Sequence, residues 1–385
     1  MKRERKNRKE NTVDMAFKGV LYPDEKQREL IEKTFGCCRY VYNRFLNERL
    51  LAYRKEGKNL SYTEQCRKLT ILKGEPETEW LKEVDSTALQ NSLENLQNAY
   101  DNFFRSLKKG PKKGRPRFKK KHQSSQSYQS TNNSNSIRME GDRKMLLPKL
   151  GEVSCRFGRL PKGRILSATV RREADGTYAV TVMSEEPRPE QMKKTGKNTG
   201  IDLGIRTLAV TSEGTEYKNP KTYDRNLKKL IRAQRKLSRK TKDSRNGEKQ
   251  RILVAKIHVK IRNQRQDAIH KMTHELVKEN DVICMEDLDV KELLQTRLAK
   301  EVSDASFGEI RRQLEYKTEW YGKQLVITDR WYPSSQTCSG CGTVNRNVKD
   351  LKIRRWRCPV CKEMHDRDIN AAKNILNEGL KKISS

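Results

Sequence analysis

The feature that most constrains this chain is a pair of Cys-x-x-Cys sequences near its C-terminus. Cys338 and Cys341 form the first pair, Cys358 and Cys361 form the second, and 16 residues separate the two pairs. Four thiolates at this spacing are the ligand set of a tetrahedral zinc ribbon, which leaves no coordination position open. Four unrelated thiols are the alternative, but a repeated pair at this separation favours a metal site. We therefore expect a structural Zn²⁺ in residues 331–362.

An acidic helix start follows the second cysteine pair. Apolar residues recur at helical spacing after Asp368: Ala371, Ala372, Ile375 and Leu376. An Asp at the start of a helix commonly caps its backbone N–H groups. The same carboxylate is equally suited to hold a metal ion, and these residues alone leave both roles open.

The charge of the chain predicts its partner. The 385 residues carry a formal net charge of +34, with 35% charged and only 34% hydrophobic residues. So few apolar residues predict modest cores. So large a positive charge opposes compaction unless a polyanion neutralises it. We therefore expect the protein to bind nucleic acid.

Other partners and locations are not favoured. No apolar run approaches the length of a membrane-spanning helix, so we expect no membrane partner. The first ten residues are basic and lack the apolar core of a secretion signal, which indicates a cytoplasmic protein. No Walker phosphate loop is present, and we expect no nucleotide cofactor.

A basic tract at residues 105–121 contains ten Lys or Arg and no acidic residue. It is interrupted by glycine and proline, so it is either a solvated linker or a segment that lies along phosphates. We prefer phosphate contact. The candidate nucleic-acid-binding residues are Lys108, Lys109, Lys112, Lys113, Arg115, Arg117, Lys119, Lys120 and Lys121.

Alternation and helical periodicity outline the remaining elements. Strands are expected at residues 12–21, 165–170, 178–182, 200–210, 282–285 and 325–328, and helices over residues 24–107, 226–279 and 303–321. The helical stretch at 226–279 is strongly basic. It is either a solvated hairpin or a surface that braces a nucleic-acid duplex, and the sequence favours neither.

Two further carboxylates lie at strands. Asp202 is embedded in the apolar stretch 200–210, and Glu286 directly follows the apolar residues 282–285. A buried charge costs several kcal/mol unless it is paired or bound to metal. Carboxylate oxygens suit Mg²⁺ or Mn²⁺, and two such ions about 4 Å apart would support phosphodiester hydrolysis. Asp202, Glu286 and Asp368 are therefore candidate catalytic and magnesium-binding residues.

Two segments resemble a known family. Pro333-Ser-Ser-Gln-Thr-Cys-Ser-Gly-Cys-Gly342 and Asp366-Arg-Asp-Ile-Asn-Ala-Ala-Lys-Asn-Ile375 resemble the end of TnpB proteins of bacterial insertion sequences, which are relatives of type V CRISPR effectors. The segment from Phe35 to Asn43 resembles the helical recognition lobe of the same family. The resemblance assigns the last carboxylate of a RuvC-like nuclease centre to Asp368, with Asp366 as the rival.

The resemblance implies an α+β multidomain fold. An N-terminal β-barrel with a helical-bundle insertion would be followed by an RNase H-like (RuvC-like) α/β nuclease domain that is interrupted by a zinc ribbon. The expected parts are residues 1–22 and 123–196 for the barrel, 23–122 for the helical lobe, 197–330 and 363–385 for the nuclease domain, and 331–362 for the ribbon.

The resemblance also implies an activity, namely RNA-guided cleavage of DNA. A guide RNA would pair with one strand of double-stranded target DNA, and the protein would hold the backbones. The expected location is the bacterial cytoplasm, at the nucleoid when bound to DNA. A strand-joining transposase and a nuclease-inactive RNA-guided repressor remain the alternatives, although a repressor is expected to lack one of the three acids.

Overall fold

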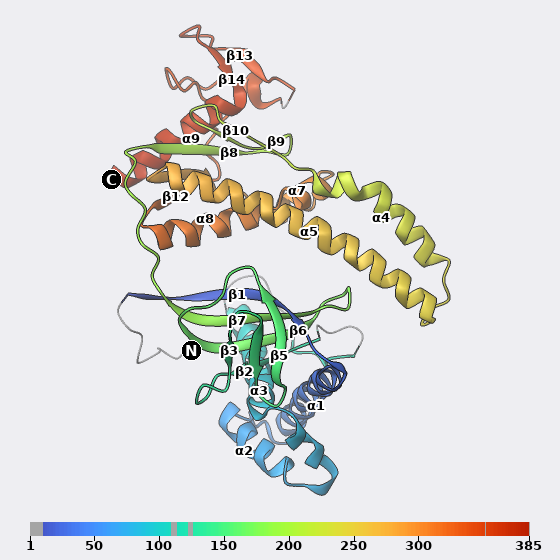
Figure 1. Ribbon diagram of the computed structural model, residues 1–385. Coiled ribbons are helices and arrows are strands. Elements are labelled where there is room, and N and C mark those ends of the chain that lie inside the picture. The colour runs from blue at the N-terminus through green and yellow to red at the C-terminus, as the bar shows by residue number, and fades with distance from the viewer. Residues whose placement is uncertain (1–10, 109–113, 122–125, 351, 385) are drawn as a thin grey trace. The chain divides into compact units, whose positions relative to one another are not determined.

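The computed structural model describes residues 11–108, 114–121, 126–350 and 352–384 (Figure 1). The chain divides into two compact units, Met1–Arg188 and Pro189–Ser385. Pro187 and Pro189 flank Arg188, the last residue of the first unit. Each unit is built around its own β-sheet.

The first unit is organised on a curled, seven-stranded antiparallel sheet. Its strands are β1 (Thr12–Tyr22), β2 (Ser127–Thr131), β3 (Arg138–Glu140), β4 (Lys144–Leu147), β5 (Gly151–Phe157), β6 (Arg164–Arg172) and β7 (Tyr178–Pro187). Their order is β2-β6-β7-β1-β5-β4-β3, and within the described residues the edge strands β2 and β3 do not pair with each other. Strand β1 buries every second side chain, including Val13, Met15 and Phe17, which confirms the alternation in its sequence.

A helical insertion separates β1 from β2. It consists of α1 (Glu25–Glu56), α2 (Tyr62–Leu72), the 3-10 helix η1 (Pro76–Glu83) and α3 (Ser86–Lys108). Capping boxes begin both α1, at Asp24, and α2, at Ser61, because each side chain accepts a hydrogen bond from the backbone three residues later. Apolar residues of α1 and α3 are fully buried, so this part of the chain is a packed bundle, as its helical periodicity predicts.

The second unit contains a mixed five-stranded sheet. Its strands are β8 (Asn198–Leu203), β9 (Thr207–Thr211), β10 (Glu216–Lys218), β11 (Val282–Glu286) and β12 (Gln324–Thr328), in the order β10-β9-β8-β11-β12. The first three in chain order pair antiparallel, whereas β11 runs parallel to both β8 and β12. The ends of β8 and β11 therefore lie at one edge of the sheet.

The prediction of one strand over residues 200–210 is wrong. A turn after Leu203 divides it into β8 and β9, which pair with each other. The backbone N–H of Gly204 donates to the carbonyl of Leu208 across this turn, 3.2 Å away. A side chain at Gly204 would meet the carbonyl oxygen of Thr207 at 2.8 Å, so the turn requires glycine here.

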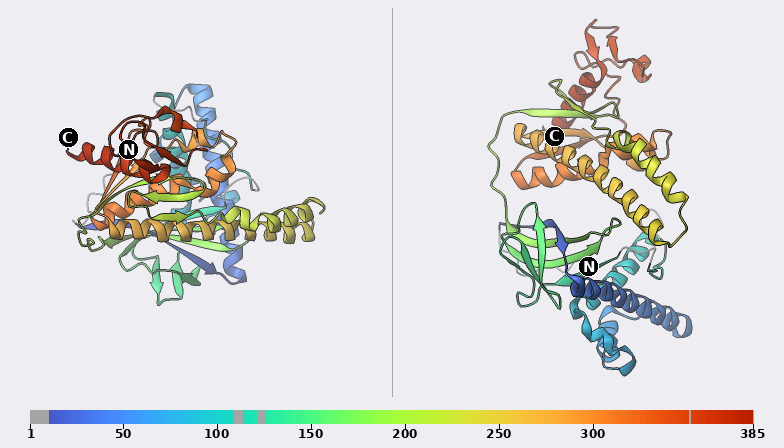
Figure 2. Two further views of the ribbon diagram at one scale, coloured as in Figure 1. Left: turned by 90° about the horizontal axis from the view of Figure 1, so that it is seen from above. Right: turned by 45° about the vertical axis from the view of Figure 1, so that its right-hand side comes forward.

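Helices cover both faces of this sheet (Figures 1 and 2). The helices of this unit are α4 (Thr222–Ser238), α5 (Arg245–Glu279), α6 (Val290–Leu293), α7 (Ala299–Ala305), α8 (Phe307–Tyr321) and α9 (Arg367–Ser384). Apolar side chains of α5 and α8 pack on one face, and those of α9 pack on the other. The single helix expected over residues 303–321 is wrong, because Ser306 adopts a left-handed conformation that separates α7 from α8.

Helix α9 lies unusually close to the sheet. A side chain at Gly200 of β8 would meet the carbonyl oxygen of Ala372 at 2.0 Å, and one at Gly379 of α9 would meet Cys284 Sγ of β11 at 2.3 Å. Glycine at both positions permits this contact. The approach brings the first turn of α9 to the edge of the sheet where β8 and β11 end.

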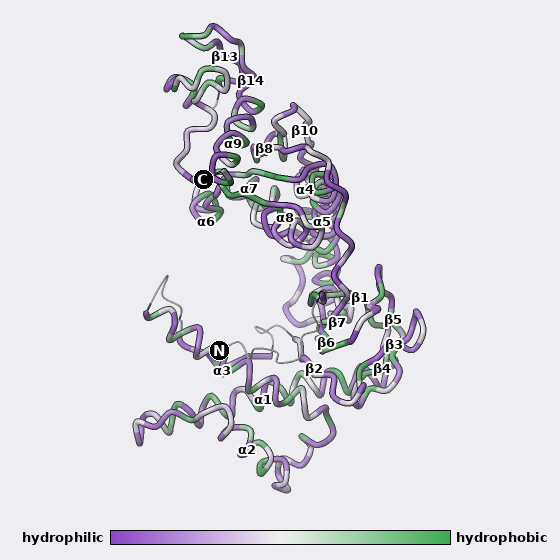
Figure 3. The backbone as a smooth tube through the Cα atoms, turned by 90° about the vertical axis from the view of Figure 1, so that its left-hand side faces the viewer, coloured by the Kyte–Doolittle hydropathy of each residue, from purple (hydrophilic) through white to green (hydrophobic). Residues whose placement is uncertain are grey.

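Little of the chain is hydrophobic over a long stretch. Green segments are short and alternate with purple ones along the backbone (Figure 3). Within the described ranges, no helix is both long and apolar enough to span a bilayer. Between β12 and α9 the chain forms η2 (Arg346–Lys349) and the short hairpin of β13 (Arg355–Arg357) and β14 (Met364–Asp366), which belong to the cysteine-rich segment.

Candidate active site

Three carboxylates from separate parts of the sequence line one cavity. Asp202 lies one residue before the end of β8, Glu286 is the last residue of β11, and Asp368 is in the first turn of α9. The cavity has a volume of about 710 Å³, and all three residues belong to its wall. This is the edge at which the parallel strands β8 and β11 end, where open α/β sheets bind ligands. The structure thus brings together the three acids that the sequence singles out.

Burial in this cavity disfavours ionisation of Asp202 and Glu286. Burial raises the pKa of Asp202 well above its usual value, and the nearby Glu286 and Asp368 raise it further, against the opposing effect of Arg367 and Arg354. Burial also raises the pKa of Glu286. Clustered, desolvated carboxylates of this kind are stabilised by a divalent cation, which favours their charged form. The donor set, oxygen only, fits Mg²⁺ or Mn²⁺.

The structure separates the roles of Asp366 and Asp368. One carboxylate oxygen of Asp366 accepts hydrogen bonds from the backbone N–H groups of Asp368, at 3.0 Å, and Ile369, at 3.3 Å. Asp366 therefore caps α9. The carboxylate of Asp368 instead contacts the guanidinium of Arg354, with its two oxygens 3.1 and 3.3 Å from Nη1. Helix capping does not explain Asp368.

Three further side chains at the cavity were not expected from the sequence. Ser334 donates a hydrogen bond to Glu286 Oε1, and Arg354 and Arg367 line the wall beside Asp368. The arginines reach the cavity from the cysteine-rich segment and from α9. The sequence context of Arg354, one Arg among many, carries no signal, whereas Arg367 lies within the second segment that resembles TnpB proteins. Ser334 lies within the first segment that resembles TnpB proteins, so the sequence draws attention to this stretch but does not predict the contact of Ser334 with Glu286.

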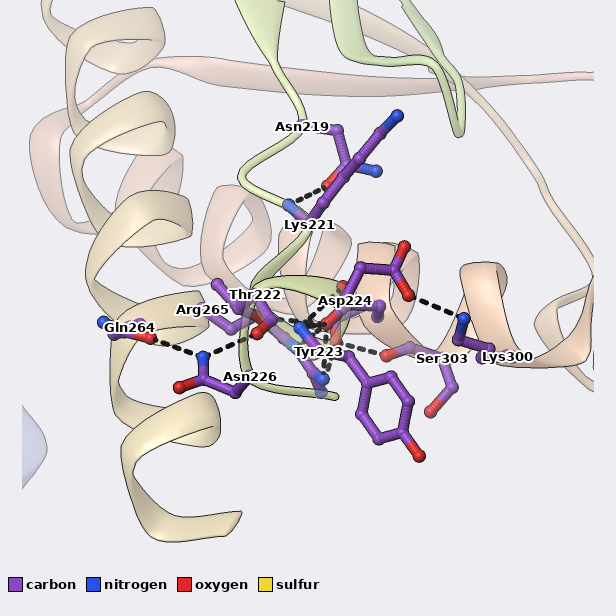
Figure 4. Close-up of polar contacts among 12 residues, drawn as sticks. Asn219, Lys221, Thr222, Tyr223, Asp224, Asn226, Gln264, Arg265, Lys300 and Ser303 are labelled. Carbon is purple, nitrogen blue, oxygen red and sulfur yellow. Dashed lines mark hydrogen bonds and ion pairs between the residues drawn. The ribbon is translucent and has the colours of Figure 1, made fainter. Parts of the chain in front are cut away.

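A polar network surrounds Asp304, which also lines the cavity (Figure 4). The carboxylate of Asp304, on α7, accepts hydrogen bonds from Thr222 Oγ1 at 2.9 Å and from the backbone N–H of Tyr223 at 3.1 Å. It also pairs with Arg265 of α5 at 2.7 Å. Asp304 is almost fully buried, so this pairing ties α4, α5 and α7 together.

The four cysteines converge on one point. Their sulfur atoms all lie within 4.8 Å of one another, with Cys338 and Cys361 3.5 Å apart and Cys341 and Cys358 3.6 Å apart. Val348 and Trp356 pack around the buried pair Cys338 and Cys358. Four thiols at the corners of such a cluster fit a tetrahedral metal ion.

A histidine beside this cluster was not expected from the sequence. His365 Nε2 lies 3.0 Å from Cys338 Sγ, and its ring packs 4.8 Å from that of Trp356. It also belongs to an alternative group of donors with Cys338 and Glu363. His365 therefore lies beside the four-cysteine cluster and contacts one of its four sulfur atoms.

The basic tract is only partly described. Lys109, Lys112 and Lys113 lie outside the described residues. Lys119 is half-buried, with its ammonium 4.1 Å from the centre of the Tyr42 ring and its backbone N–H and carbonyl bonded to the Asn43 amide. Arg115, 5.9 Å from the Phe103 ring, and Arg117, Lys108, Lys120 and Lys121 are exposed. The tract is therefore anchored on α1 at Lys119, while most of its charge faces solvent.

Family profiles of known proteins match three parts of the chain. A family profile described as "Probable transposase" matches residues 179–297, one described as "Cas12f1-like, TNB domain" matches residues 307–375, and one described as "Helix-turn-helix domain" matches residues 13–58. In the structure, residues 13–58 form β1 and the single long helix α1.

Similar proteins extend over almost the whole chain. A protein of Streptomyces pristinaespiralis, named "Putative RNA-guided DNA endonuclease", is 40% identical over 96% of this chain and 90% of its own length. InsQ of Escherichia coli K12, with the same description, is 32% identical over 94% of this chain and 92% of its own length.

A solved Cas12f1–sgRNA–target DNA complex aligns at 15% identity over 95% of this chain and 99% of the solved chain, with a TM-score of 0.37. A TM-score this low is too weak to establish a shared fold.

Proposed function

This chain belongs to the TnpB family of RNA-guided DNA endonucleases, and on that premise we propose that it hydrolyses DNA phosphodiester bonds at the cavity of Asp202, Glu286 and Asp368. The observation that carries the proposal is the convergence of these three acids at one edge of the second sheet. Carboxylates that are clustered and removed from water destabilise one another, so a role in packing alone does not explain why three of them lie together here.

Asp202, Glu286 and Asp368 would together hold two Mg²⁺ or Mn²⁺ ions. When bound, such ions activate a water molecule and stabilise the charge of the leaving oxygen. The protein itself supplies orientation: β8 and β11 fix the first two carboxylates, and α9 fixes the third. Arg354 and Arg367 line the same cavity and offer guanidinium groups to the phosphate oxygens of the substrate.

The four-cysteine cluster supports a structural Zn²⁺ at Cys338, Cys341, Cys358 and Cys361. Two short strands, one turn and a few apolar side chains make up the segment around it. So small a core is insufficient to fold on its own, and metal binding would supply the missing stability.

The finer architecture belongs to the same proposal. The order of the second sheet, three antiparallel strands followed by two parallel ones, supports an RNase H-like, RuvC-like nuclease domain. The curled first sheet, interrupted by helices, supports a barrel-like domain with an inserted helical lobe. A guide RNA and target double-stranded DNA are the proposed partners, and the charge of +34 supports a polyanionic ligand.

The deciding experiment incubates the protein, loaded with its copurifying RNA, with DNA that matches that RNA. We expect cleavage in Mg²⁺ and none in chelator. Replacement of Asp202, Glu286 or Asp368 by Ala should abolish cleavage and leave DNA binding intact, because the basic surface rather than the acids holds the backbones. Double variants should be hardly worse than single ones, since each loss removes the same metal site.

The same experiment contains its contrary outcomes. Cleavage that persists in chelator, or that Glu286→Ala leaves undiminished, would contradict the two-metal mechanism. Joining of DNA ends in place of hydrolysis would identify a transposase. Matched binding without any cleavage by the wild-type protein would identify a binding module.

A further inference from the structure

A short loop connects the two candidate metal sites. We call residues 333–337, between Tyr332 and Cys338, the knuckle loop. Cys338 is the first cysteine of the four-cysteine cluster. Its Ser334 donates a hydrogen bond to Glu286 Oε1. Its last residue, Thr337, directly precedes Cys338. The loop therefore touches a proposed magnesium ligand at one end and continues into a proposed zinc ligand at the other.

Two asparagines of α9 hold this loop. Asn374 Nδ2 donates to the carbonyl of Ser334 at 2.8 Å and to that of Thr337 at 2.6 Å. Asn370 Nδ2 donates to the same Thr337 carbonyl at 2.7 Å, and Asn370 Oδ1 accepts from the backbone N–H of Ser339 at 2.9 Å. Asn370 and Asn374 are 1% and 3% exposed. Loss of Asn374 would remove the donor to the Ser334 carbonyl, and loss of Asn370 would remove the acceptor of the Ser339 N–H.

The knuckle loop is also closed on itself. The backbone N–H and the hydroxyl of Thr337 both donate to the carbonyl of Pro333, at 3.0 and 2.9 Å. With both ends joined in this way and its middle bonded to α9, the loop has little freedom to move by itself. The position of the Ser334 hydroxyl follows the position of α9.

Helix α9 carries Asp368 as well. It thus fixes one proposed ligand directly, and a second, Glu286 of β11, through Asn374 and Ser334. A hydrogen bond to one carboxylate oxygen restricts rotation of the whole group, as partners outside the ligand sphere do in metal sites. Without that bond, a Glu side chain has three rotatable bonds by which to leave the geometry that the ion requires.

We propose that Ser334 is a positioning residue that orients Glu286 for metal binding, and that Asn374 acts through it. The inference rests on the proposed function, because it requires Glu286 to be a metal ligand. A purely structural Ser334 would only satisfy a buried carboxylate. If Ser334 orients Glu286, loss of its hydroxyl should weaken metal binding. If its role is purely structural, metal affinity should not change.

The test uses Fe²⁺ in place of Mg²⁺. With ascorbate and peroxide, bound Fe²⁺ generates hydroxyl radicals that cut the polypeptide near the ion, so fragments that end near Asp202 and Glu286 report occupancy of this site alone. The full-length, RNA-loaded protein is titrated with Fe²⁺. We expect Ser334→Ala to raise the half-saturating concentration roughly 10- to 100-fold, the usual effect of losing such a partner.

Two variants sharpen the comparison. Ser334→Thr keeps the hydroxyl and should restore most of the affinity. Ser335→Ala is the matched control, because the neighbouring hydroxyl lies 3.5 Å from Arg367 Nη2 and contacts no carboxylate. Zinc content, from elemental analysis, should be equal in all variants. Equal zinc would show that the four-cysteine cluster is folded in each of them. Half-saturation of Ser334→Ala within twofold of wild type, or a Thr variant as weak as the Ala variant, would overturn the proposal.

Asn374 is tested by a double-variant cycle. If it acts through Ser334, the half-saturating concentration of Asn374→Ala, Ser334→Ala together should match that of the weaker single variant. Full additivity would overturn its indirect role. Wild-type protein that cuts neither itself with Fe²⁺ nor matched DNA with Mg²⁺ would refute the proposed function. Wild-type cutting of both, with an unchanged Ser334→Ala, would refute only the positioning role.

Discussion

At the scale of single residues, two acids close together in sequence have different tasks. Asp366 and Asp368 are two residues apart: Asp366 directly precedes α9, and Asp368 lies in its first turn. The hydrogen bonds of Asp366 go to backbone N–H groups of α9, whereas Asp368 lines the cavity with Asp202 and Glu286. Because Asp366 caps the helix, the carboxylate of Asp368 is not needed for helix stability and is available for the proposed chemistry.

Substitution of each acid should separate stability from activity. Asp366→Ala removes a helix cap and should lower the free energy of unfolding by about 1 kcal/mol, with cleavage largely retained. Asp368→Ala should abolish cleavage with little change in stability. Chemical denaturation and the Mg²⁺-dependent cleavage assay measure the two effects. An inactive Asp366 variant beside an active Asp368 variant would reverse our choice of ligand.

At the scale of elements, α5 and α8 enclose an unusual charge. Lys317 of α8 is 6% exposed and donates hydrogen bonds to the carbonyl of His270 at 2.9 Å and to Thr273 Oγ1 at 2.7 Å. No carboxylate is bonded to it in the described structure. Burial lowers the pKa of Lys317 to about 8, although the charge of Glu309 opposes the shift.

This shift predicts how stability depends on pH. The folded protein releases the Lys317 proton near pH 8, whereas the unfolded chain retains it to about pH 10.4. The unfolded state therefore binds more protons between these values, and stability rises with pH through that window. Lys317→Met should lack this rise. We expect the difference in unfolding free energy between variant and wild type to shift in favour of wild type from pH 8 to pH 10.

Chemical denaturation at several pH values provides the measurement. Lys278→Met, at an exposed position of the adjacent helix α5, is the control and should follow the wild-type dependence. Parallel curves for wild type and Lys317→Met would show that the ammonium remains charged throughout.

At the scale of the whole molecule, the excess of positive charge determines how the protein binds nucleic acid. A net charge of +34 favours any polyanion, so it supplies affinity without sequence choice. Base pairing with a guide would supply that choice. Within the basic tract, Arg117 and Lys121 are exposed, whereas Lys119 is directed at the ring of Tyr42.

Reversal of exposed charges should flatten the salt dependence of nucleic-acid binding. Each phosphate contact contributes roughly 0.9 to the slope of log affinity against log salt for duplex DNA and roughly 0.7 for single strands. Arg117→Glu with Lys121→Glu should reduce the slope by about the value for two contacts. Lys119→Ala should instead lower stability, because it removes the contact with Tyr42. An unchanged slope in the double variant would assign the tract to a linker role.

The sequence by itself determined those features that depend on residues close to one another in the chain. The cysteine pairs predict a four-thiol cluster because ligand spacing is local, and the sulfurs do converge. Alternation predicts β1, and helical periodicity predicts α1, α3 and α9, because burial of one face imposes the pattern. The three acids were recognisable because each stands out in an apolar or motif context. The split of residues 200–210 was missed, since its cause is a close carbonyl contact at Gly204.

Only the tertiary structure decided what depends on distant contacts. Asp366 and Asp368 lie two residues apart at the start of α9, and the approach of α9 to β8 at Gly200 places only Asp368 in the cavity wall. Ser334, Arg354 and Asp304 reach that cavity from positions 20 to 152 residues away from Asp202 and from each other. Their hydrogen bonds and ion pairs form only after the sheet, α7 and α9 have packed, so no local pattern in the chain specifies them.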